Sequence, residues 1–426
     1  MIKSLIQKQF FKNTSYYLVA NCIKAVIPFI ILPFLTHYLI PEEYGRWSVF
    51  SAVLSFLIPL TAFGLNNMIG RNYHTLDRVK HSEMNFMSTL IVFGISTLSF
   101  VLIVVLSLFY DDILNIPIEY YYWIPFLCVL QNFIYFYKII LRHENRALLF
   151  SILEIVNSLG LRAGGLLLVI FVSATWQSLL LSQILISIIL FILILFLSIK
   201  EKKIRIKWNK TEAKQYFLMG WPMMPHAMGG IILTLSDRII LGAMTNNIQV
   251  GIYSLAANLG VAVLMFCTAF NNSWGPYLHR QMKNVTEAVK IKIVKHTYLY
   301  CLGVIFLSIA LGIFCNLYIL YFVSDDYAKA IDVLWWIIAG SAVYGMSLSI
   351  SHYLIILGKT GVLPLITMTA AIINIFLTIV LVKYNGFVGA GQATFIAYSI
   401  YFVLLFWQSH IRYPMPWMAA IFKQKS

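Results

Sequence analysis

The stretch from Gly220 to Tyr277 decides the fold class of this chain. It reads GWPMMPHAMGGIILTLSDRIILGAM (220–244), then TNNIQVGIYSLAANLG (245–260), and closes with NNSWGPY (271–277). The two long apolar runs predict two helices joined by a short polar turn. Asp237 and Arg238 stand side by side within the first run. A charge at membrane depth costs about 2.5–3.5 kcal/mol, so each is expected to face a polar cavity or a partner.

The composition of the whole chain agrees with this interpretation. Hydrophobic residues make up 60% of the 426 and charged residues only 11%, whereas soluble domains are closer to half apolar and a quarter charged. The net charge of +15 is not accompanied by a basic face or a nucleic-acid motif, so no nucleic-acid partner is expected. The sequence therefore predicts a protein whose partner is the lipid bilayer.

The apolar runs predict an all-α polytopic membrane protein with about twelve transmembrane helices, each close to the roughly 20 residues that cross the hydrocarbon. The predicted spans are 14–36, 46–68, 84–109, 120–141, 146–172, 176–199, 215–243, 251–273, 296–322, 332–357, 361–383 and 388–409. They form two six-helix bundles, 1–199 and 215–426, joined by a basic cytoplasmic linker, 200–214, with a short cytoplasmic tail at the end. EYGRWS (43–48) is echoed by QVGIYS (249–254), which suggests that the two halves are duplicates.

The loop charges predict the orientation in the membrane. Lys and Arg gather in residues 3–12, 71–80, 138–146, 200–214, 280–295 and the tail. The loops on the opposite side carry acidic side chains, and their only basic residues are Arg46, Lys329 and Lys383. Because basic loops stay in the cytoplasm, both termini are expected there. The outer loops are too short for a folded catalytic domain, and no H-E-x-x-H, P-loop or G-x-S-x-G motif occurs. Neither enzyme activity nor a metal site is expected.

Ionisable residues inside the spans are the first candidates for function: Lys24, Glu154, Arg162, Asp237 and Arg238. Lys24 and Arg162 lie about ten residues, or about 15 Å, from either end of their helices, too far for comfortable snorkelling. We interpret Lys24, Arg162 and Arg238 as the bases of a cationic, water-filled cavity for an anionic substrate. The alternative is structural: Arg162 pairing with Glu154, Lys24 bonding a carbonyl, and Arg238 snorkelling outward.

Two acids and three amides complete the candidate site. Glu154 and Asp237 are candidates for a charge pair or for proton or sodium coupling, because a buried carboxyl can exchange a proton near neutral pH. No other cofactor is expected. Asn258, Asn271 and Asn272 are candidates for hydrogen bonds to sugar hydroxyls, with helix–helix hydrogen bonds as the alternative.

Small residues and prolines predict local helix geometry. Gly160, Gly164 and Gly165 predict the close approach of a neighbouring helix. Pro222 and Pro225 are expected to bend the start of the seventh span, either for alternating access or as a static kink.

The central stretch resembles the bacterial polysaccharide exporters, which are oligosaccharide flippases of the multidrug/oligosaccharidyl-lipid/polysaccharide (MOP) superfamily. Two other segments also resemble this family, PEEYG (41–45) and YNGFVGAGQAT (384–394), although His37 and Ile40 depart from the family's arginine and glycine. The residues of the central stretch that match are Asp237, Leu241, Gly242, Gly251, Tyr253, Ala256, Trp274 and Pro276.

This resemblance implies a MATE-like fold with two bundles around a central cavity. It implies a flippase that moves polyprenyl-pyrophosphate-linked oligosaccharide repeat units to the outer leaflet of the bacterial cytoplasmic (inner) membrane by alternating access, for O-antigen, capsule or exopolysaccharide assembly. A polysaccharide polymerase and a chain-length regulator are the implied protein partners. The alternatives are a multidrug cation antiporter of the same superfamily, a peptidoglycan-precursor flippase, and, least supported, a membrane-embedded glycan transferase.

Overall fold

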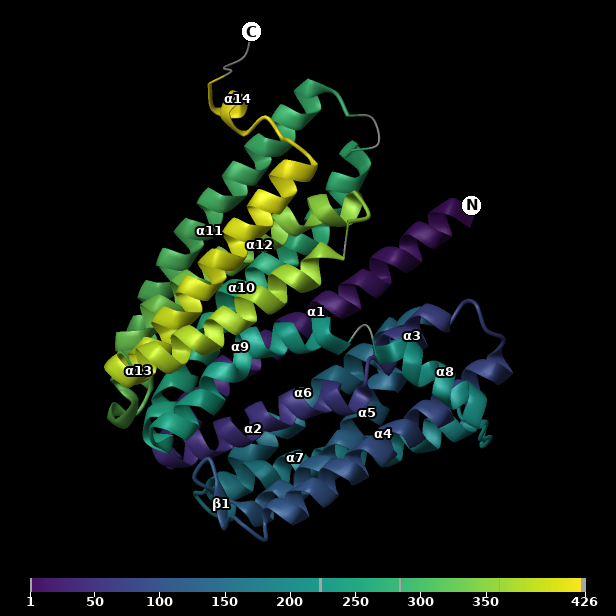
Figure 1. Cartoon of the computed structure of the whole chain (residues 1–426), viewed down its shortest axis with the longest axis vertical. Coiled ribbons are helices and arrows are strands. Elements are labelled where there is room, and N and C mark those ends of the chain that lie inside the picture. The colour runs from purple at the N-terminus through teal and green to yellow at the C-terminus, as the bar shows by residue number, and fades with distance from the viewer. Residues whose placement is uncertain (1, 222–223, 283–284, 360, 423–426) are drawn as a thin grey trace. The chain divides into compact units, whose positions relative to one another are not determined.

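The computed structural model describes residues 2–221, 224–282, 285–359 and 361–422; for residues 2–14, 18, 225–227 and 420–422 it describes the backbone alone. The chain forms two compact units, residues 1–231 and 232–426. Both are built of helices (Figure 1), because a helix satisfies all its backbone hydrogen bonds within one segment, as hydrocarbon surroundings require. The protein is an all-α polytopic membrane protein, as predicted.

The described residues of the first unit include one small β-hairpin among the helices. Leu114 and Asn115, with φ of 57° and 58°, form its turn, and Ile113 pairs with Ile116. The elements in chain order are α1 (Ile2–Tyr38), α2 (Pro41–Ala62), α3 (Leu65–Asn72), α4 (Arg78–Leu106), β1 (Asp112–Ile113), β2 (Ile116–Pro117), a 3₁₀ turn (Ile118–Tyr122), α5 (Trp123–His143), α6 (Ala147–Phe171), α7 (Trp176–Lys200) and α8 (Lys210–Gly220). Helix α9 (Met224–Met244) crosses the boundary to the second unit.

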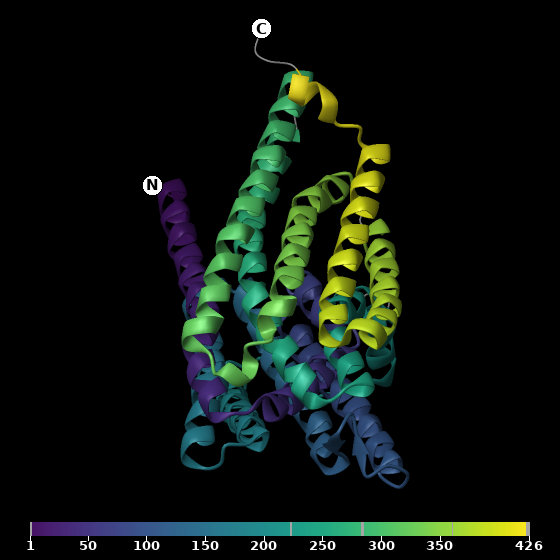
Figure 2. The same ribbon diagram turned by 90° about the vertical axis from the view of Figure 1, so that its left-hand side faces the viewer.

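The second unit continues with long helices around a core that includes Trp274, Tyr353 and Tyr398. Its elements are α10 (Asn247–Gln281), α11 (Glu287–Phe322), a 3₁₀ turn (Asp325–Tyr327), α12 (Ala330–Ile356), α13 (Val362–Arg412) and α14 (Trp417–Phe422). Helix α13 doubles back on itself at Gly386, which has φ 55° and ψ −138°. Figures 1 and 2 show its two arms, light green and yellow, side by side.

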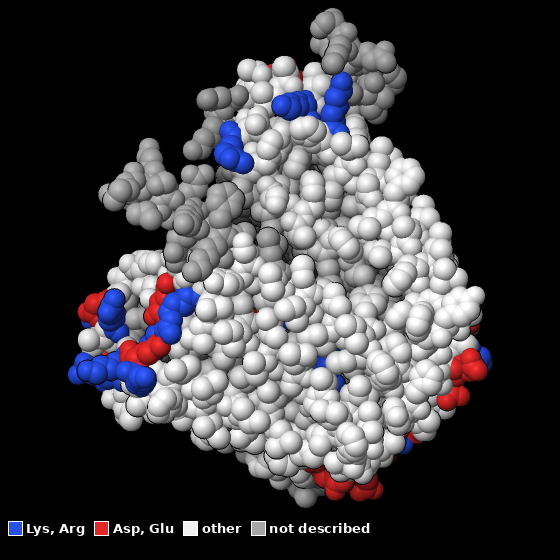
Figure 3. Space-filling view, turned by 180° about the vertical axis from the view of Figure 1, so that it is seen from behind, with Lys and Arg blue, Asp and Glu red and all other residues white. Residues whose placement is uncertain are grey.

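The described helices account for the twelve predicted spans. Ten of them are long and apolar enough to cross a membrane. Helix α13 counts once among the ten although it contains two predicted spans, and α9 supplies the remaining one. On the face shown in Figure 3, charged side chains gather near the margins of the view and the surface between them carries few.

Two predicted spans differ from the observed helices. The span predicted at 46–68 is divided because Phe63 and Gly64 adopt left-handed conformations, with φ of 50° and 76°. The span predicted at 215–243 is divided into α8, which ends at Gly220, and α9. Pro222 and the side chain of Pro225, expected to bend this span, lie outside the described residues. A Cβ atom on Gly64 would lie 2.1 Å from the carbonyl oxygen of Gly220, so the two backbones meet directly.

The glycine stripe of α6 packs against α7. A Cβ atom on Gly160 would lie 2.4 Å from Ile186, and one on Gly165 would lie 2.8 Å from Leu179. The Ser182 hydroxyl donates to the Gly160 carbonyl at 2.8 Å. The close helix approach predicted from these glycines is therefore confirmed.

Ion pairs hold the first part of the predicted linker against the first unit. The group of residues that ties it, here called the ionic clamp, comprises Glu83, Glu144, Arg146, Glu201, Lys203 and Lys207. Lys203 pairs with Glu144 at 2.7 Å and with Glu201 at 2.6 Å, Arg146 pairs with Glu201 at 2.7 Å, and Lys207 pairs with Glu83 at 2.8 Å. Burial raises the pKa of Glu201, but hydrogen bonds from Arg146 and Lys203 outweigh it and hold the pKa below the usual value.

The two similar sequence segments, EYGRWS (43–48) and QVGIYS (249–254), occupy matching positions in the two units. Each lies in the first turns of a long helix, α2 or α10. Glu43 accepts the backbone N–H of Trp176, where α7 begins, at 2.9 Å. Gln249, at the matching position, accepts the N–H of Phe387, where the second arm of α13 begins, at 3.2 Å. The predicted last span of each half is thus attached in the same way, which supports duplication.

Candidate functional site

Three helices of the first unit bring two lysines and one glutamate together. Lys24 of α1 forms an ion pair with Glu154 of α6, and Lys138 of α5 pairs with the other carboxylate oxygen of Glu154 at 2.6 Å. The side chains of Glu154 and Lys138 are only 12% and 11% exposed. A carboxylate shared by two ammonium groups leaves a net positive charge between the helices. We call Lys24, Glu154 and Lys138 the charged triad.

The prediction from sequence missed Lys138. It grouped Lys138 with the basic loop that follows, whereas the structure places it inside α5, more than one turn before the helix ends at His143. A signal was available, because Lys138 already fell within the predicted span 120–141. Its partner could not be identified from sequence, since only the packing of α5 against α6 sets Lys138 opposite Glu154.

Arg162 lies two turns beyond Glu154 on α6 but does not pair with it. Its guanidinium donates to the hydroxyl of Ser158, one turn earlier, at 2.9 Å. Tyr44 of α2 lies near enough to interact with it electrostatically. The structural alternative considered from sequence, a pair between Arg162 and Glu154, does not occur in the part of the chain described. Arg162 is thus a further cationic side chain of α6 that is separate from the charged triad.

Asp237 and Arg238 of α9 have different surroundings. Asp237 is buried, and its carboxylate accepts a hydrogen bond from the Tyr253 hydroxyl of α10 and another from the backbone N–H of Arg238 at 2.8 Å. The Arg238 side chain is half-buried, and its Nε has no hydrogen-bond partner among the described residues. Asp237 therefore binds one helix to the next, while Arg238 retains hydrogen-bonding capacity.

The three asparagines lie along α10. Asn258 and Asn272 are exposed and Asn271 is half-buried. The Oδ1 atom of Asn271 has no hydrogen-bond partner within the described ranges. Their role as sugar contacts stays a prediction. Lys24 and Arg162 belong to the first unit and Arg238 to the second, so their convergence on one central cavity also stays a prediction.

Comparisons with known proteins agree on the family and on the fold. A family model described as polysaccharide biosynthesis protein matches residues 10–282. A search of curated proteins found no significant match. Among solved structures, the chain is similar to the lipid II flippase MurJ in an inward closed conformation, with a TM-score of 0.68, 16% identity, and coverage of 93% of this chain and 87% of MurJ.

Two further structures have the same fold. One is an inward-facing multidrug resistance MATE family transporter of the MOP superfamily, with a TM-score of 0.67, 14% identity, and coverage of 94% of this chain and 96% of that one. The other is a MOP superfamily transporter from Pyrococcus furiosus, described by the reverse polarity of its binding pocket, with a TM-score of 0.58, 12% identity, and coverage of 96% and 94%. The predicted MATE-like fold is confirmed.

Proposed function

Because the chain belongs to the polysaccharide biosynthesis protein family, we propose that it is a flippase for polyprenyl-pyrophosphate-linked oligosaccharides. In this proposal it moves repeat units from the inner to the outer leaflet of a bacterial cytoplasmic membrane, by alternating access, to supply O-antigen, capsule or exopolysaccharide assembly. Both termini lie in the cytoplasm, and a polymerase and a chain-length regulator use the product.

The excess of bases among the charges inside the helices carries the proposal. The charged triad and Arg162 together hold three positive charges, on Lys24, Lys138 and Arg162, against the one carboxylate of Glu154. A pyrophosphate head group cannot cross hydrocarbon unaided, because an unpaired charge is too costly to bury there. Cationic side chains that face a polar path would bind it, while the polyprenyl tail stays in the lipid.

The charged triad also suggests how the head group could be accepted and released. In this structure Glu154 forms ion pairs with both lysines. A pyrophosphate that approached Lys24 would compete with Glu154 for the same ammonium group, and Lys138 would keep Glu154 paired when Lys24 turned to the substrate. Protonation of Glu154 or Asp237 is the proposed route for proton coupling.

Multidrug cation antiport is the second candidate, because a MATE family transporter has the same fold. The buried carboxylate of Asp237 is the feature that favours it. A path rich in Lys and Arg repels cationic drugs, however, and Asp237 already accepts hydrogen bonds from Tyr253 and Arg238. We therefore place antiport second.

Lipid analysis of cells that lack the gene tests the proposal. The complete lipid-linked repeat unit should accumulate in the extract, as measured by mass spectrometry, and wild-type protein should clear it. A charged contact to the head group contributes about 1.5–3 kcal/mol, so Lys24→Gln and Arg162→Gln should clear it at least roughly tenfold more slowly. Lys383→Gln, at an exposed position of α13, is the matched control and should behave as wild type.

One result would contradict the flippase, and another would contradict the role of the two bases. An unchanged lipid profile in the deletion strain, accompanied by new sensitivity to cationic drugs, would favour the antiporter. Full clearance by Lys24→Gln and Arg162→Gln, at expression equal to wild type, would show that these bases do not handle the substrate.

A further inference from the structure

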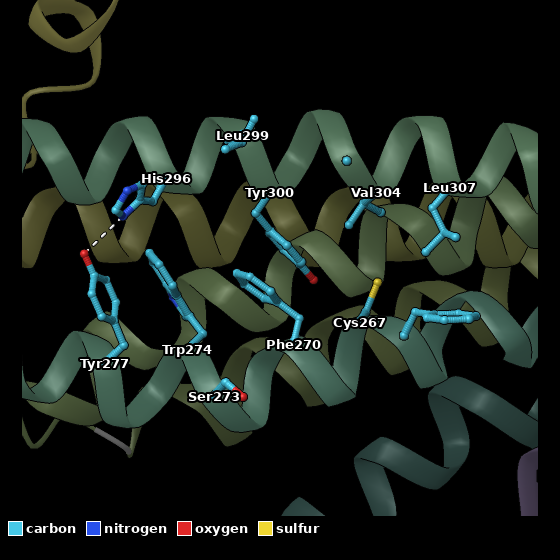
Figure 4. A pocket seen from close by; sticks show the side chains of 12 residues that line it. Cys267, Phe270, Ser273, Trp274, Tyr277, His296, Leu299, Tyr300, Val304 and Leu307 are labelled. Carbon is cyan, nitrogen blue, oxygen red and sulfur yellow. Dashed lines mark hydrogen bonds between the residues drawn. The ribbon is translucent and has the colours of Figure 1, made fainter. Parts of the chain in front are cut away.

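A groove of about 580 Å³ lies between α10 and α11 in the second unit. Aromatic rings follow one another along it (Figure 4). The rings of Phe270 and Tyr300 stack with centroids 4.0 Å apart, Phe270 and Trp274 stack at 5.7 Å, and Trp274 and Tyr277 lie at 5.4 Å. The family-like motif that contains Trp274 thus forms one wall of the groove, a role unrelated to the cationic site.

The wall is apolar because its polar atoms bond to α12 behind it. The indole Nε1–H of Trp274 donates to the carbonyl of Ser349 at 3.2 Å, and the hydroxyl of Tyr300 donates to the carbonyl of Gly345 at 2.8 Å. The groups of Trp274 and Tyr300 that remain to contact a ligand are therefore their ring faces, and Cys267 and Ser273 are among the other lining residues. Gly303 of α11 also lines the groove, and a Cβ atom there would meet no other atom within 4 Å. The groove is therefore open beside Gly303.

The length of the groove corresponds to one leaflet. From Phe266 to Tyr277 helix α10 rises about 16 Å at 1.5 Å per residue, which is about half of a 30 Å hydrocarbon core. Both helices that form it are candidate membrane spans. Phe266 and Leu299, which line the groove, are exposed, so a hydrocarbon chain of lipid can reach it. One acyl chain matches its length, whereas a polyprenyl carrier chain is several times longer.

Basic residues continue both walls beyond one end of the groove. At this end the hydroxyl of Tyr277 and Nδ1 of His296 are 3.0 Å apart. Residues three or four apart share a helix face, so Arg280 continues the stripe of Tyr277 on α10 and Lys292 that of His296 on α11. Both are exposed. A negatively charged head group above the groove would meet these charges.

We propose that the groove is a site for an anionic phospholipid of the leaflet on the basic side. One acyl chain lies along the aromatic wall from Tyr277 toward Phe266, and the phosphate contacts Arg280 and Lys292. This site requires only that the chain spans the membrane, and it is independent of the substrate that the protein carries. Its occupant contacts both α10 and α11, the two helices that line the groove.

Photolabelling of the full-length protein in lipid nanodiscs tests the site. The probe is a phosphatidylglycerol with a photoactivatable diazirine on one acyl chain, and mass spectrometry maps the labelled peptides. Label should concentrate on residues 266–307. Gly303→Leu, which fills the groove, should reduce this label at least tenfold, equivalent to about 1.4 kcal/mol. Gly94→Leu, at a glycine of α4 whose added Cβ also meets nothing within 4 Å, should leave it unchanged.

Two further arms identify the occupant. A phosphatidylcholine probe with the same acyl chain should label the groove less, and Arg280→Gln combined with Lys292→Gln should abolish the difference between the two probes. Equal labelling by both probes of the wild type would overturn the charge recognition. Displacement of the label by a small mole fraction of polyprenyl phosphate would instead make the carrier lipid the occupant. Label spread evenly over all lipid-facing helices would show that no site exists.

Discussion

Tyr253 and Asp237 show how one residue pair can link a sequence motif to packing. Both belong to the family-like central stretch, and the structure makes them donor and acceptor of one hydrogen bond between α10 and α9. Both are buried. A buried acceptor that loses its donor pays its full cost of desolvation, about 1–3 kcal/mol, so this pair contributes to the stability of the second unit whether or not Asp237 also exchanges a proton.

We therefore expect Tyr253→Phe to lower the free energy of unfolding by about 1–3 kcal/mol. Thermal unfolding of the purified protein would show this as a lower Tm. Tyr353→Phe is the matched control, because among the described residues the hydroxyl of this buried tyrosine has one long contact, 3.4 Å to the Thr297 hydroxyl, and its loss should change Tm less. Adding Asp237→Asn to Tyr253→Phe should restore part of the loss. Equal Tm values for the two single variants would contradict this role.

At the residue scale the sequence indicated which charges lie inside apolar helices, but it did not indicate how they pair. Lys24, Glu154 and Arg162 were identified because charges are rare within apolar runs. The partners of Glu154 lie 130 and 16 positions away in sequence, so spacing along one helix could not reveal them. The local pairing considered instead, between Glu154 and Arg162, fails because Arg162 bonds to Ser158 on its own helix.

At the scale of elements, the contact between α6 and α7 depends on the absence of a side chain at Gly160. A Cβ atom there would approach Ile186 to 2.4 Å, and the Ser182 hydroxyl bonds to the Gly160 carbonyl. Overpacking of this kind costs about 1–3 kcal/mol. Gly160→Val should therefore lower Tm, while Gly94→Val, in open space on α4, should be nearly neutral. If both variants have the same Tm, the close approach is not important for stability.

The existence of each membrane-spanning helix could be predicted from the sequence, whereas the residues at which the helices end could be predicted less well. A run of about 20 apolar residues needs a helix to cross lipid, and the turn at Gly386 has a signal in Asn385-Gly386, since this dipeptide favours tight turns. The break after α2 carries a weaker signal, because Phe63 adopts a left-handed conformation that aromatic residues rarely take. Its cause is the contact between Gly64 and Gly220, which is distant in sequence.

At the scale of the whole molecule, the bias of Lys and Arg toward one set of loops predicts the orientation. Single cysteines in a variant without the five native ones can test it. A membrane-impermeant maleimide should label Asn115→Cys, in the β-hairpin, in intact cells. Lys210→Cys, in the first turn of α8, should be labelled only after permeabilisation. Leu98→Cys, within the predicted span 84–109, is the control and should stay unlabelled. Labelling of Lys210→Cys in intact cells would invert the topology.

Six residues of sequence are enough to detect the similarity between the two units. They do not reveal the hydrogen bond that both units form at this position. Glu43 accepts the backbone N–H of Trp176, the first residue of the predicted span 176–199, and Gln249 accepts that of Phe387, the residue just before the predicted span 388–409. Nothing in the echo itself indicates that bond, because the donor belongs to a segment more than a hundred positions away. A shared attachment at matching positions is stronger evidence for duplication than matching letters.

The ionic clamp has a consequence for biosynthesis. All six of its residues precede Lys210, so the ribosome has made every partner before the second unit emerges. Domains generally fold as units during synthesis, the N-terminal one first. The first unit can therefore form these ion pairs around residues 200–207 while the rest of the chain is still being translated.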